Sequence, residues 1–402
     1  SSRFHPDNRW GKFWSVGASW RLSEEKFMQG LDWLNGLTLK FSYGVQGNNS
    51  VGSYYAYQAL YDLSSPNATL PGATINDVAN ADLTWESNNN LNTGLEARLF
   101  NRLDLSFEFY NRKTTDMLLA YPLPASSGFS SYYRNSGEMR NRGIEFALTG
   151  YIFDKEDLQW SVTWMGSTVN NKVLKLTDEG KDIIGSSQII RVGETLYSYY
   201  VARSAGVDPM TGLKMYWAKD KDGNDYITTS TSKAQENRVI VGSRIPDLYG
   251  SLSTSFRWKN IDLAVSTNYS IGGKNYDGVY QEFMGCYYVA EAKHKDILRA
   301  WRKPGDITDV PKYTIGDVPI ATDDKLIDAS YFSIKNITLG YTLPKLWTSK
   351  IGFKSARIAA SVDNLWIFTH LKGMDPQYSL TGGTSYVYAP TRTVSFSLAL
   401  KF

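Results

Sequence analysis

Apolar and polar side chains alternate along much of this chain with a period of two, which is the spacing of a β-strand with two unlike faces. The alternation is clearest in the last nine residues, where every second side chain is apolar: Val394, Phe396, Leu398, Leu400 and Phe402. A strand needs this pattern when one face meets lipid and the other meets a polar lumen. The pattern therefore predicts a transmembrane β-strand at the end of the chain.

The same alternation predicts about thirteen strands in all. They are 14–22, 37–45, 91–99, 103–109, 143–151, 160–170, 198–205, 213–218, 249–258, 261–269, 330–343, 356–366 and 394–402. Most are near the roughly 9 to 11 residues that a tilted membrane strand requires. The sequence thus predicts an all-β fold, an antiparallel up-and-down barrel in a membrane.

The connections between these strands alternate between long and short. The long ones are 47–84, 115–142, 171–197, 219–248, 272–329 and 367–390, and the short ones include 101–102, 153–157, 208–212 and 259–260. Outer-membrane barrels have long extracellular loops and short periplasmic turns, so we expect the long connections to be extracellular. A soluble β-sandwich gives no reason for this regularity. Within one long connection, residues 282–301 have helical spacing and predict a loop helix.

The amino-acid composition is consistent with the predicted membrane barrel and adds little to it. No run approaches the roughly 20 apolar residues of a membrane helix, and a net charge of +3 gives no reason to expect nucleic acid. Cys286 is the single cysteine and the three histidines are scattered, so neither an internal disulfide nor a histidine metal centre is expected. The run 220–225 has the closely spaced carboxylates of a calcium loop but not the EF-hand spacing, which favours a plain turn.

No catalytic set, phosphate-binding loop or cofactor motif is present in the sequence, so we expect neither an enzyme nor a bound cofactor. The strand count is more informative. Single-chain bacterial barrels close with an even number of strands, whereas about thirteen is odd. The first strand, 10–22, would then expose unpaired backbone to lipid. We therefore expect residues 1–402 to form the C-terminal portion of a larger barrel, completed by an N-terminal segment.

Several stretches together resemble the SusC/RagA-like TonB-dependent transporters of Bacteroidetes outer membranes. They are 4–22, 37–48, 102–118, 141–146, 205–212, 328–344, 357–368, 373–377 and 390–402. The resemblance implies a 22-stranded barrel with an N-terminal plug, a SusD-like lipoprotein partner, and energy from the TonB-ExbB-ExbD complex through the N-terminal part. It also implies oligosaccharide or oligopeptide cargo. The terminal strand 394–402 resembles the signal that the barrel assembly machinery recognises for insertion.

Tyrosines are concentrated in the long connections and are the candidate cargo contacts: Tyr54, Tyr55, Tyr57, Tyr132, Tyr133, Tyr287, Tyr288, Tyr386 and Tyr388. Flat aromatic faces stack on sugar rings, but tyrosines in such loops also contact partner proteins. Two other functions stay open. A siderophore or vitamin receptor would share the barrel and lack the lipoprotein, and a structural or adhesive barrel would lack the plug.

Overall fold

A computed structural model describes residues 1–64, 72–176, 180–285, 291–371, 373–378 and 388–402. The contacts within the chain define two compact units. Unit 1 comprises Ser1–Leu148, Val169–Asp182 and Arg191–Thr195, and unit 2 comprises Thr149–Thr168, Ile183–Ile190 and Leu196–Phe402. Each unit is built on long antiparallel strands.

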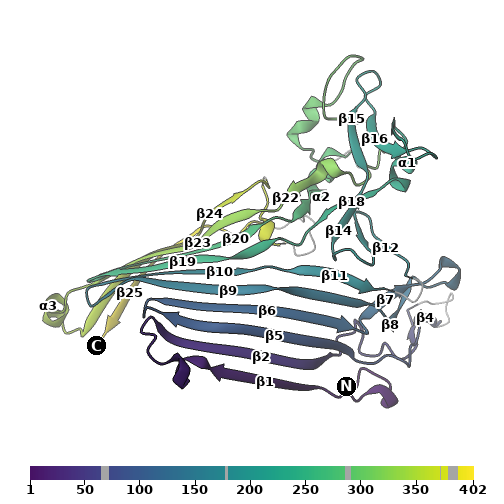
Figure 1. The fold of residues 1–402 in the computed structure, drawn as a ribbon. Helices are drawn as coiled ribbons and strands as arrows, with labels where there is room; N and C mark the ends of the chain where they lie inside the picture. The colour runs from purple at the N-terminus through teal and green to yellow at the C-terminus, as the bar shows by residue number, and fades with distance from the viewer. Residues whose placement is uncertain (65–71, 177–179, 286–290, 372, 379–387) are drawn as a thin grey trace. The chain divides into compact units, whose positions relative to one another are not determined.

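Unit 1 contains long strands that pair in the order β1-β2-β5-β6-β9, with β11 also paired to β9; unit 1 includes β9 only as far as Leu148. The strands lie side by side in sequence order in Figure 1. Their bounds are Trp14–Arg21 for β1, Leu34–Asn48 for β2, Glu86–Leu99 for β5, Leu103–Thr115 for β6, Glu138–Lys155 for β9 and Asn170–Lys175 for β11. Since β1 pairs only with β2 among the described residues, it is the edge of this sheet.

The register places unlike side chains on the two faces of this sheet. One apolar row crosses four strands, with the members Trp20, Leu39, Leu95 and Phe107. The adjacent row is small or charged, with the members Ser19, Lys40, Gly94 and Glu108. Large apolar side chains such as Phe41 are about half exposed on the first face. A continuous exposed apolar face of this kind is suited to lipid contact.

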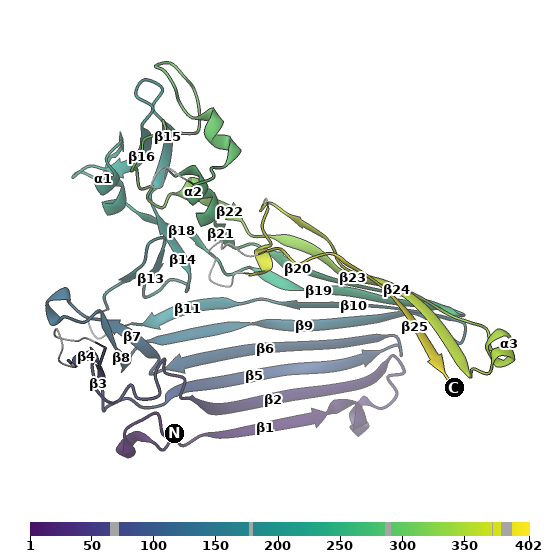
Figure 2. The ribbon, with the colours of Figure 1, turned by 180° about the vertical axis from the view of Figure 1, so that it is seen from behind.

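Unit 2 contains six long strands that pair in the order β10-β19-β20-β23-β24-β25. The bounds are Leu158–Ser167 for β10, Leu248–Trp258 for β19, Ile261–Ile271 for β20, Tyr331–Thr342 for β23, Ser355–Thr369 for β24 and Thr393–Lys401 for β25. Helix α3, Lys345–Thr348, lies in the turn between β23 and β24. Figure 2 shows α3 at one end of these strands and the shorter elements of unit 2 at the other.

Eleven of the segments predicted from alternation are long strands of these sheets. The interpretation of 198–205 and 213–218 as barrel strands is wrong. They form β14 (Ser198–Val201), β15 (Arg203–Val207) and β16 (Lys214–Lys219), which belong to small separate sheets. Their apolar face packs on protein instead of lipid, because Tyr199, Val201 and Tyr216 are buried. The predicted turn 208–212 consequently lies within one connection between β10 and β19.

The remaining elements of unit 2 are short. The small sheets are β12-β13-β14-β18, β15-β16-β17 and β21-β22. Their other strands are β12 (Ile183–Ile184), β13 (Gln188–Ile190), β17 (Asp225–Thr228), β18 (Val239–Ser243), β21 (Lys274–Tyr276) and β22 (Leu326–Asp328). The helices are α1 (Thr231–Glu236) and α2 (Gly278–Met284), together with 3-10 turns at Lys295–Arg299, Asp323–Lys325, Ser349–Ile351 and Pro376–Tyr378.

The prediction of one loop helix over 282–301 is wrong in its extent. Helix α2 ends before Gly285, whose backbone is extended. The next helical residues that the structure describes are the 3-10 turn at Lys295–Arg299. Residues 286–290 lie outside the described part of the chain. Of the helices that the structure describes, none is long and apolar enough to cross a membrane.

The connections of unit 1 have a small core of their own. Phe4, Val51, Ala56 and Leu83 are buried together, and Trp85 and Tyr133 pack against them. Two hairpins flank this core: β3 (Leu60–Asp62) pairs with β4 (Thr74–Asp77), and β7 (Leu118–Pro122) pairs with β8 (Ser131–Asn135). The 3-10 turns of unit 1 are Pro6–Asn8, Leu22–Glu24, Lys26–Met28 and Ala125–Ser127. The loops therefore fold onto one another and do not extend separately.

Candidate functional site

Two connections of unit 2, residues 196–247 and 273–329, pack into one body that we call the loop module. Its first buried cluster is Tyr199, Val201 and Tyr276, and its second is Ala202, Tyr216 and Ala234. Each cluster is completed by partly buried side chains from the neighbouring connection, including Ile320 and Ala321. The module therefore has its own hydrophobic core, which fixes the residues on its surface.

Hydrogen bonds join the two connections of the loop module in a fixed register. The Ala202 amide donates to the Ala321 carbonyl at 3.0 Å, and the Asp323 amide donates to the Ala202 carbonyl at 3.0 Å. The carboxylate of Asp323 also accepts from the Ser204 amide at 2.8 Å. Since these bonds join backbone to backbone or to a short side chain, they leave little freedom for one connection to slide past the other.

The tip of the β15–β16 hairpin is held by the second connection of the module. The indole of Trp301 donates to the Pro209 carbonyl at 2.8 Å, and the Gly305 amide donates to the same oxygen at 2.8 Å. Gly212, with φ of +72°, lies so close to the Trp301 ring that a Cβ at this position would be 2.4 Å from it. The hairpin tip thus requires glycine for two reasons, backbone conformation and space.

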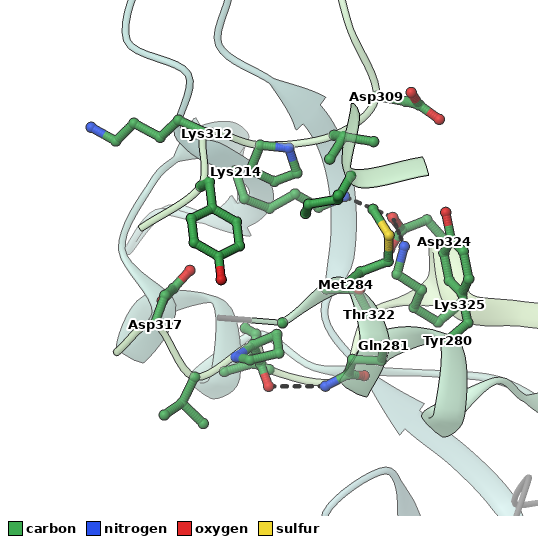
Figure 3. A pocket seen from close by; sticks show the side chains of 18 of the residues that line it. Lys214, Tyr280, Gln281, Met284, Asp309, Lys312, Asp317, Thr322, Asp324 and Lys325 are labelled. Carbon is green, nitrogen blue, oxygen red and sulfur yellow. Dashed lines mark hydrogen bonds and ion pairs between the residues drawn. The ribbon is translucent and has the colours of Figure 1, made fainter. Parts of the chain in front are cut away.

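A cavity of about 320 Å³ lies within this module, between β16, α2 and the segment 309–325. Figure 3 shows the side chains around it. Much of its wall is aliphatic, thioether or proline: Met284, Ile297, Val310, Pro311, Val318 and Pro319. Gln281 is held in place because its amide donates to the Pro319 carbonyl at 3.0 Å. This volume is within the range of small-ligand pockets, at its lower end.

One end of the cavity is charged. Lys214 of β16 donates to the Asp324 carboxylate at 2.7 Å, and Lys325 lies 3.4 Å from the same carboxylate. Figure 3 shows both ammonium groups reaching Asp324. Burial disfavours the ionised carboxyl, but the two ammonium groups outweigh it and lower the pKa of Asp324 to about 2. Two ammonium groups and one carboxylate meet at this end, and Asp309, Lys312 and Asp317 line other parts of the cavity.

The sequence-predicted tyrosines that the structure describes do not line this cavity, and five of them are in the loops of unit 1. Tyr54 is 67% exposed, and the Arg3 guanidinium lies 4.2 Å from its ring centroid. Tyr55 is also exposed, and Tyr57 makes an edge contact with the His5 ring at 6.2 Å between centroids. Tyr54 and Tyr55 therefore present aromatic surface to the outside of this unit.

The tyrosines of β8 have structural contacts. Tyr133 packs on the buried cluster around Phe4, and its carbonyl accepts from the Asn80 amide at 2.8 Å. Tyr132 makes an edge contact with Tyr121 at 5.8 Å. Tyr388 of unit 2 is 95% exposed. The other candidates, Tyr287, Tyr288 and Tyr386, lie outside the described residues.

Comparison with known proteins identifies the family. The family model described as "TonB dependent receptor-like, beta-barrel" matches residues 1–365. The chain belongs to the TonB-dependent receptor barrels. Barrels of this family lie in the outer membrane, which agrees with the exposed apolar face of the long strands.

Relatives of this receptor barrel match along its whole length. It is 31% identical to TonB-dependent receptor P3 of Formosa agariphila and 27% identical to TonB-dependent receptor SusC of Bacteroides thetaiotaomicron, over 100% of the chain and 43% and 41% of the relatives. It is also similar to the structure of the RagAB peptide transporter, with a TM-score of 0.89 and 31% identity over 100% of the chain and 44% of the solved chain. The chain thus spans about two-fifths of these relatives and corresponds to a C-terminal portion.

The terminal strand of the receptor barrel has the geometry that its alternation predicts. Strand β25 pairs with β24 along its whole length. The apolar side chains Val394, Phe396, Leu398 and Leu400 are exposed, and the exposed fraction reaches 80% at Phe396. Phe402 follows the strand and makes an edge contact with Phe353 at 5.0 Å. Recognition of this strand by the assembly machinery stays a prediction.

Metal binding has little support in the described part of the receptor barrel. No group of three or more His, Cys, Asp or Glu side chains close enough to hold an ion occurs among the described residues. The acidic run at 220–225 forms the turn between β16 and β17. There the Asp220 carboxylate accepts from the amides of Asp222 and Asn224, each at 2.9 Å. Hydrogen bonds from Asn224 lower the pKa of Asp220. This carboxylate is therefore used in the turn itself.

The cavity and its charged end could not be found from the sequence. Lys214 and Asp324 are 110 positions apart and neither belongs to a recognisable motif. The alternation around Lys214 is correct for a strand but does not show which segment that strand packs against. The cavity depends on the pairing of the two connections, and that pairing is a tertiary feature.

Proposed function

We propose that this chain is the C-terminal barrel portion of an outer-membrane importer that takes up oligosaccharides or oligopeptides together with a SusD-like surface lipoprotein. The match that carries the proposal is the similarity over the whole chain to the RagAB peptide transporter, with a TM-score of 0.89. The match to SusC, also over the whole chain, supports the same class of importer.

The architecture is consistent with import. A barrel of about 22 strands is too wide for side chains to fill, so a plug from the N-terminal part would close it. Opening such a plug requires energy, for which we propose the TonB-ExbB-ExbD complex. The folded loop module supplies surface for cargo or lipoprotein contacts, and we propose that the long connections are extracellular. Barrel assembly machinery and outer-membrane lipid would contact the terminal strand and the apolar face.

Purification and growth experiments test this proposal. We expect a lipoprotein to co-purify when the transporter is extracted from outer membranes in mild detergent, as identified by peptide mass spectrometry. We also expect deletion of the transporter gene to abolish growth on one class of oligomer, either peptides or glycans, as sole nutrient. Restored growth with the intact gene is the control. Loss of siderophore or vitamin uptake without a lipoprotein would favour the alternative receptor, and no uptake defect would favour a structural barrel.

The exposed tyrosines of unit 1 give a first mutational prediction. Replacing Tyr54, Tyr55 and Tyr57 together by alanine should weaken cargo binding by about a hundredfold, because each of the three aromatic contacts contributes on the order of 1 kcal/mol. Isothermal titration calorimetry with the cargo identified by growth measures the change. Tyr61→Ala is the matched control, since Tyr61 is also exposed in unit 1 but lies on β3. Equal affinity of the triple variant and the unaltered protein would exclude these residues as cargo contacts.

A further inference from the structure

We propose that the cavity of the loop module binds the carboxyl end of a short peptide, with the terminal carboxylate at Lys214 and Lys325 and the last side chain against the apolar wall. This inference rests on the proposed import function and narrows its cargo to peptides. It concerns a site of this chain that neither the sequence motifs nor the tyrosine positions indicate.

The charged end of the cavity suits an anionic group. A lysine ammonium has three donors, and the contact with Asp324 accounts for one donor on each of Lys214 and Lys325. Their side chains are only 18% and 23% exposed, so the charges are poorly screened by water. A ligand carboxylate offers two oxygens to the remaining donors of these two ammonium groups. Charge-assisted hydrogen bonds of this kind are stronger than neutral ones.

The apolar wall distinguishes a peptide from a sugar. The side chains of Met284, Ile297 and Val310 form an apolar part of the wall, beside polar lining residues such as Gln281 and Thr322, whereas a pyranose has hydroxyl groups around its whole ring. Burying hydroxyls against such a wall without partners is unfavourable. An aliphatic side chain next to a carboxylate, as in a peptide that ends in leucine or valine, matches both parts of the cavity. The volume of about 320 Å³ suits the end of a peptide and not its whole length.

The cavity is also held in shape before any ligand arrives. Tyr280 on α2 donates to the Asp296 carboxylate at 3.0 Å, and Asp309 pairs with Arg299 at 3.2 Å. The segment after Asp309 is anchored where the Lys312 amide donates to the Gly212 carbonyl at 2.9 Å. A binding site fixed by such contacts loses less conformational entropy when it is occupied. The arrangement therefore favours specific recognition of one end group.

A pair of peptide probes tests the site in the transporter as purified from outer membranes in mild detergent. The probe is a hexapeptide that ends in leucine and carries fluorescein at its amino end, prepared as the free acid and as the C-terminal amide. Fluorescence anisotropy gives the two affinities. We expect the free acid to bind the unaltered protein at least tenfold more tightly than the amide. Lys325→Gln should reduce this ratio to about twofold, whereas Lys221→Gln, in the exposed β16–β17 turn, should leave it unchanged.

A second variant tests the site without altering the charged end, in case Lys325→Gln fails to fold. Val318 lines the cavity and is 60% exposed, so replacing it should not disturb the fold. Val318→Glu adds a negative charge to the cavity lining and should weaken binding of the free acid about tenfold. Val318→Gln, which has the length of glutamate without its charge, should weaken it less. Equal affinity of acid and amide for the unaltered protein, or an unchanged ratio in both Lys325→Gln and Val318→Glu, would overturn the inference.

The failure of this inference can be told apart from failure of the import function. A transporter that binds no peptide but supports growth on an oligosaccharide would refute the peptide site and leave import intact. A transporter whose deletion affects neither growth nor uptake would refute import itself. Binding of the free acid with the expected variant effects would support the site.

Discussion

Replacing Phe396 by arginine is expected to prevent accumulation of the folded barrel. Phe396 lies near the middle of β25, opposite Ala360 of β24, and is 80% exposed on the apolar face. An arginine on the lipid-facing surface of a barrel costs about 2 to 4 kcal/mol near the middle of the bilayer. The loss of the phenylalanine ring removes further apolar contact with lipid. The combined effect is a large fraction of the roughly 5 to 15 kcal/mol that stabilises a typical domain.

The adjacent residue provides the matched control. Ser397 lies on the opposite face of the same strand, because successive side chains of a strand alternate. Ser397→Arg should therefore leave the barrel folded. Outer-membrane abundance and the heat-dependent shift of a folded barrel on gels measure both variants. Equal accumulation of Phe396→Arg and the unaltered protein would mean that this face of β25 does not meet lipid.

Replacing Gly212 by alanine is expected to detach the β15–β16 hairpin tip from the rest of the loop module. The new Cβ would lie 2.4 Å from the Trp301 ring, so the ring must move and its hydrogen bond to the Pro209 carbonyl is lost. Left-handed backbone also costs alanine roughly 1 to 2 kcal/mol. We expect a local destabilisation of about 3 kcal/mol or more, comparable to other disruptions of close packing. Faster hydrogen exchange at the tip would report it.

A substitution at Gly223 distinguishes the two causes of this destabilisation, which are backbone strain and the clash with the Trp301 ring. It also has a positive φ, +86°, but no atom lies within 4 Å of the position that a Cβ would occupy. Gly223→Ala therefore has the backbone strain without the clash and should raise exchange less. If both variants raise exchange equally, backbone strain alone explains the effect and the Trp301 contact contributes little. Trp301→Ala should reproduce the larger effect, because it removes the same contact from the other side.

The long strands were predictable because lipid and lumen impose different chemistry on alternate residues. The row of Trp20, Leu39, Leu95 and Phe107 shows how each strand repeats the same division. Strand β11 was not separated from its neighbour, since residues 160–170 were predicted as one strand while β10 ends at Ser167 and β11 begins at Asn170. The boundaries of strands depend on backbone pairing, which cannot be read from the alternation of apolar and polar residues.

The candidate site was less predictable than the fold. Alternation near Tyr199 and Tyr216 correctly indicates strands, but it cannot distinguish an apolar face that meets lipid from one that meets another loop. The sequence also does not show which of the loop tyrosines are exposed to solvent. Tyr54 is open to the outside, whereas Tyr133 is part of a core. Both are loop tyrosines beside polar residues, so only the packing separates them.

The hydrogen bonds of Ala202 to both Ala321 and Asp323 have a consequence for engineering and for evolution. The segments 196–247 and 273–329 depend on each other. They belong to the connections that join β10 to β19 and β20 to β23. Exchanging one segment alone between related barrels would leave buried amides and carbonyls without partners. Exchanging both together would carry the cavity to a new barrel wall. Natural recombination should therefore transfer the two loops as a single inherited block.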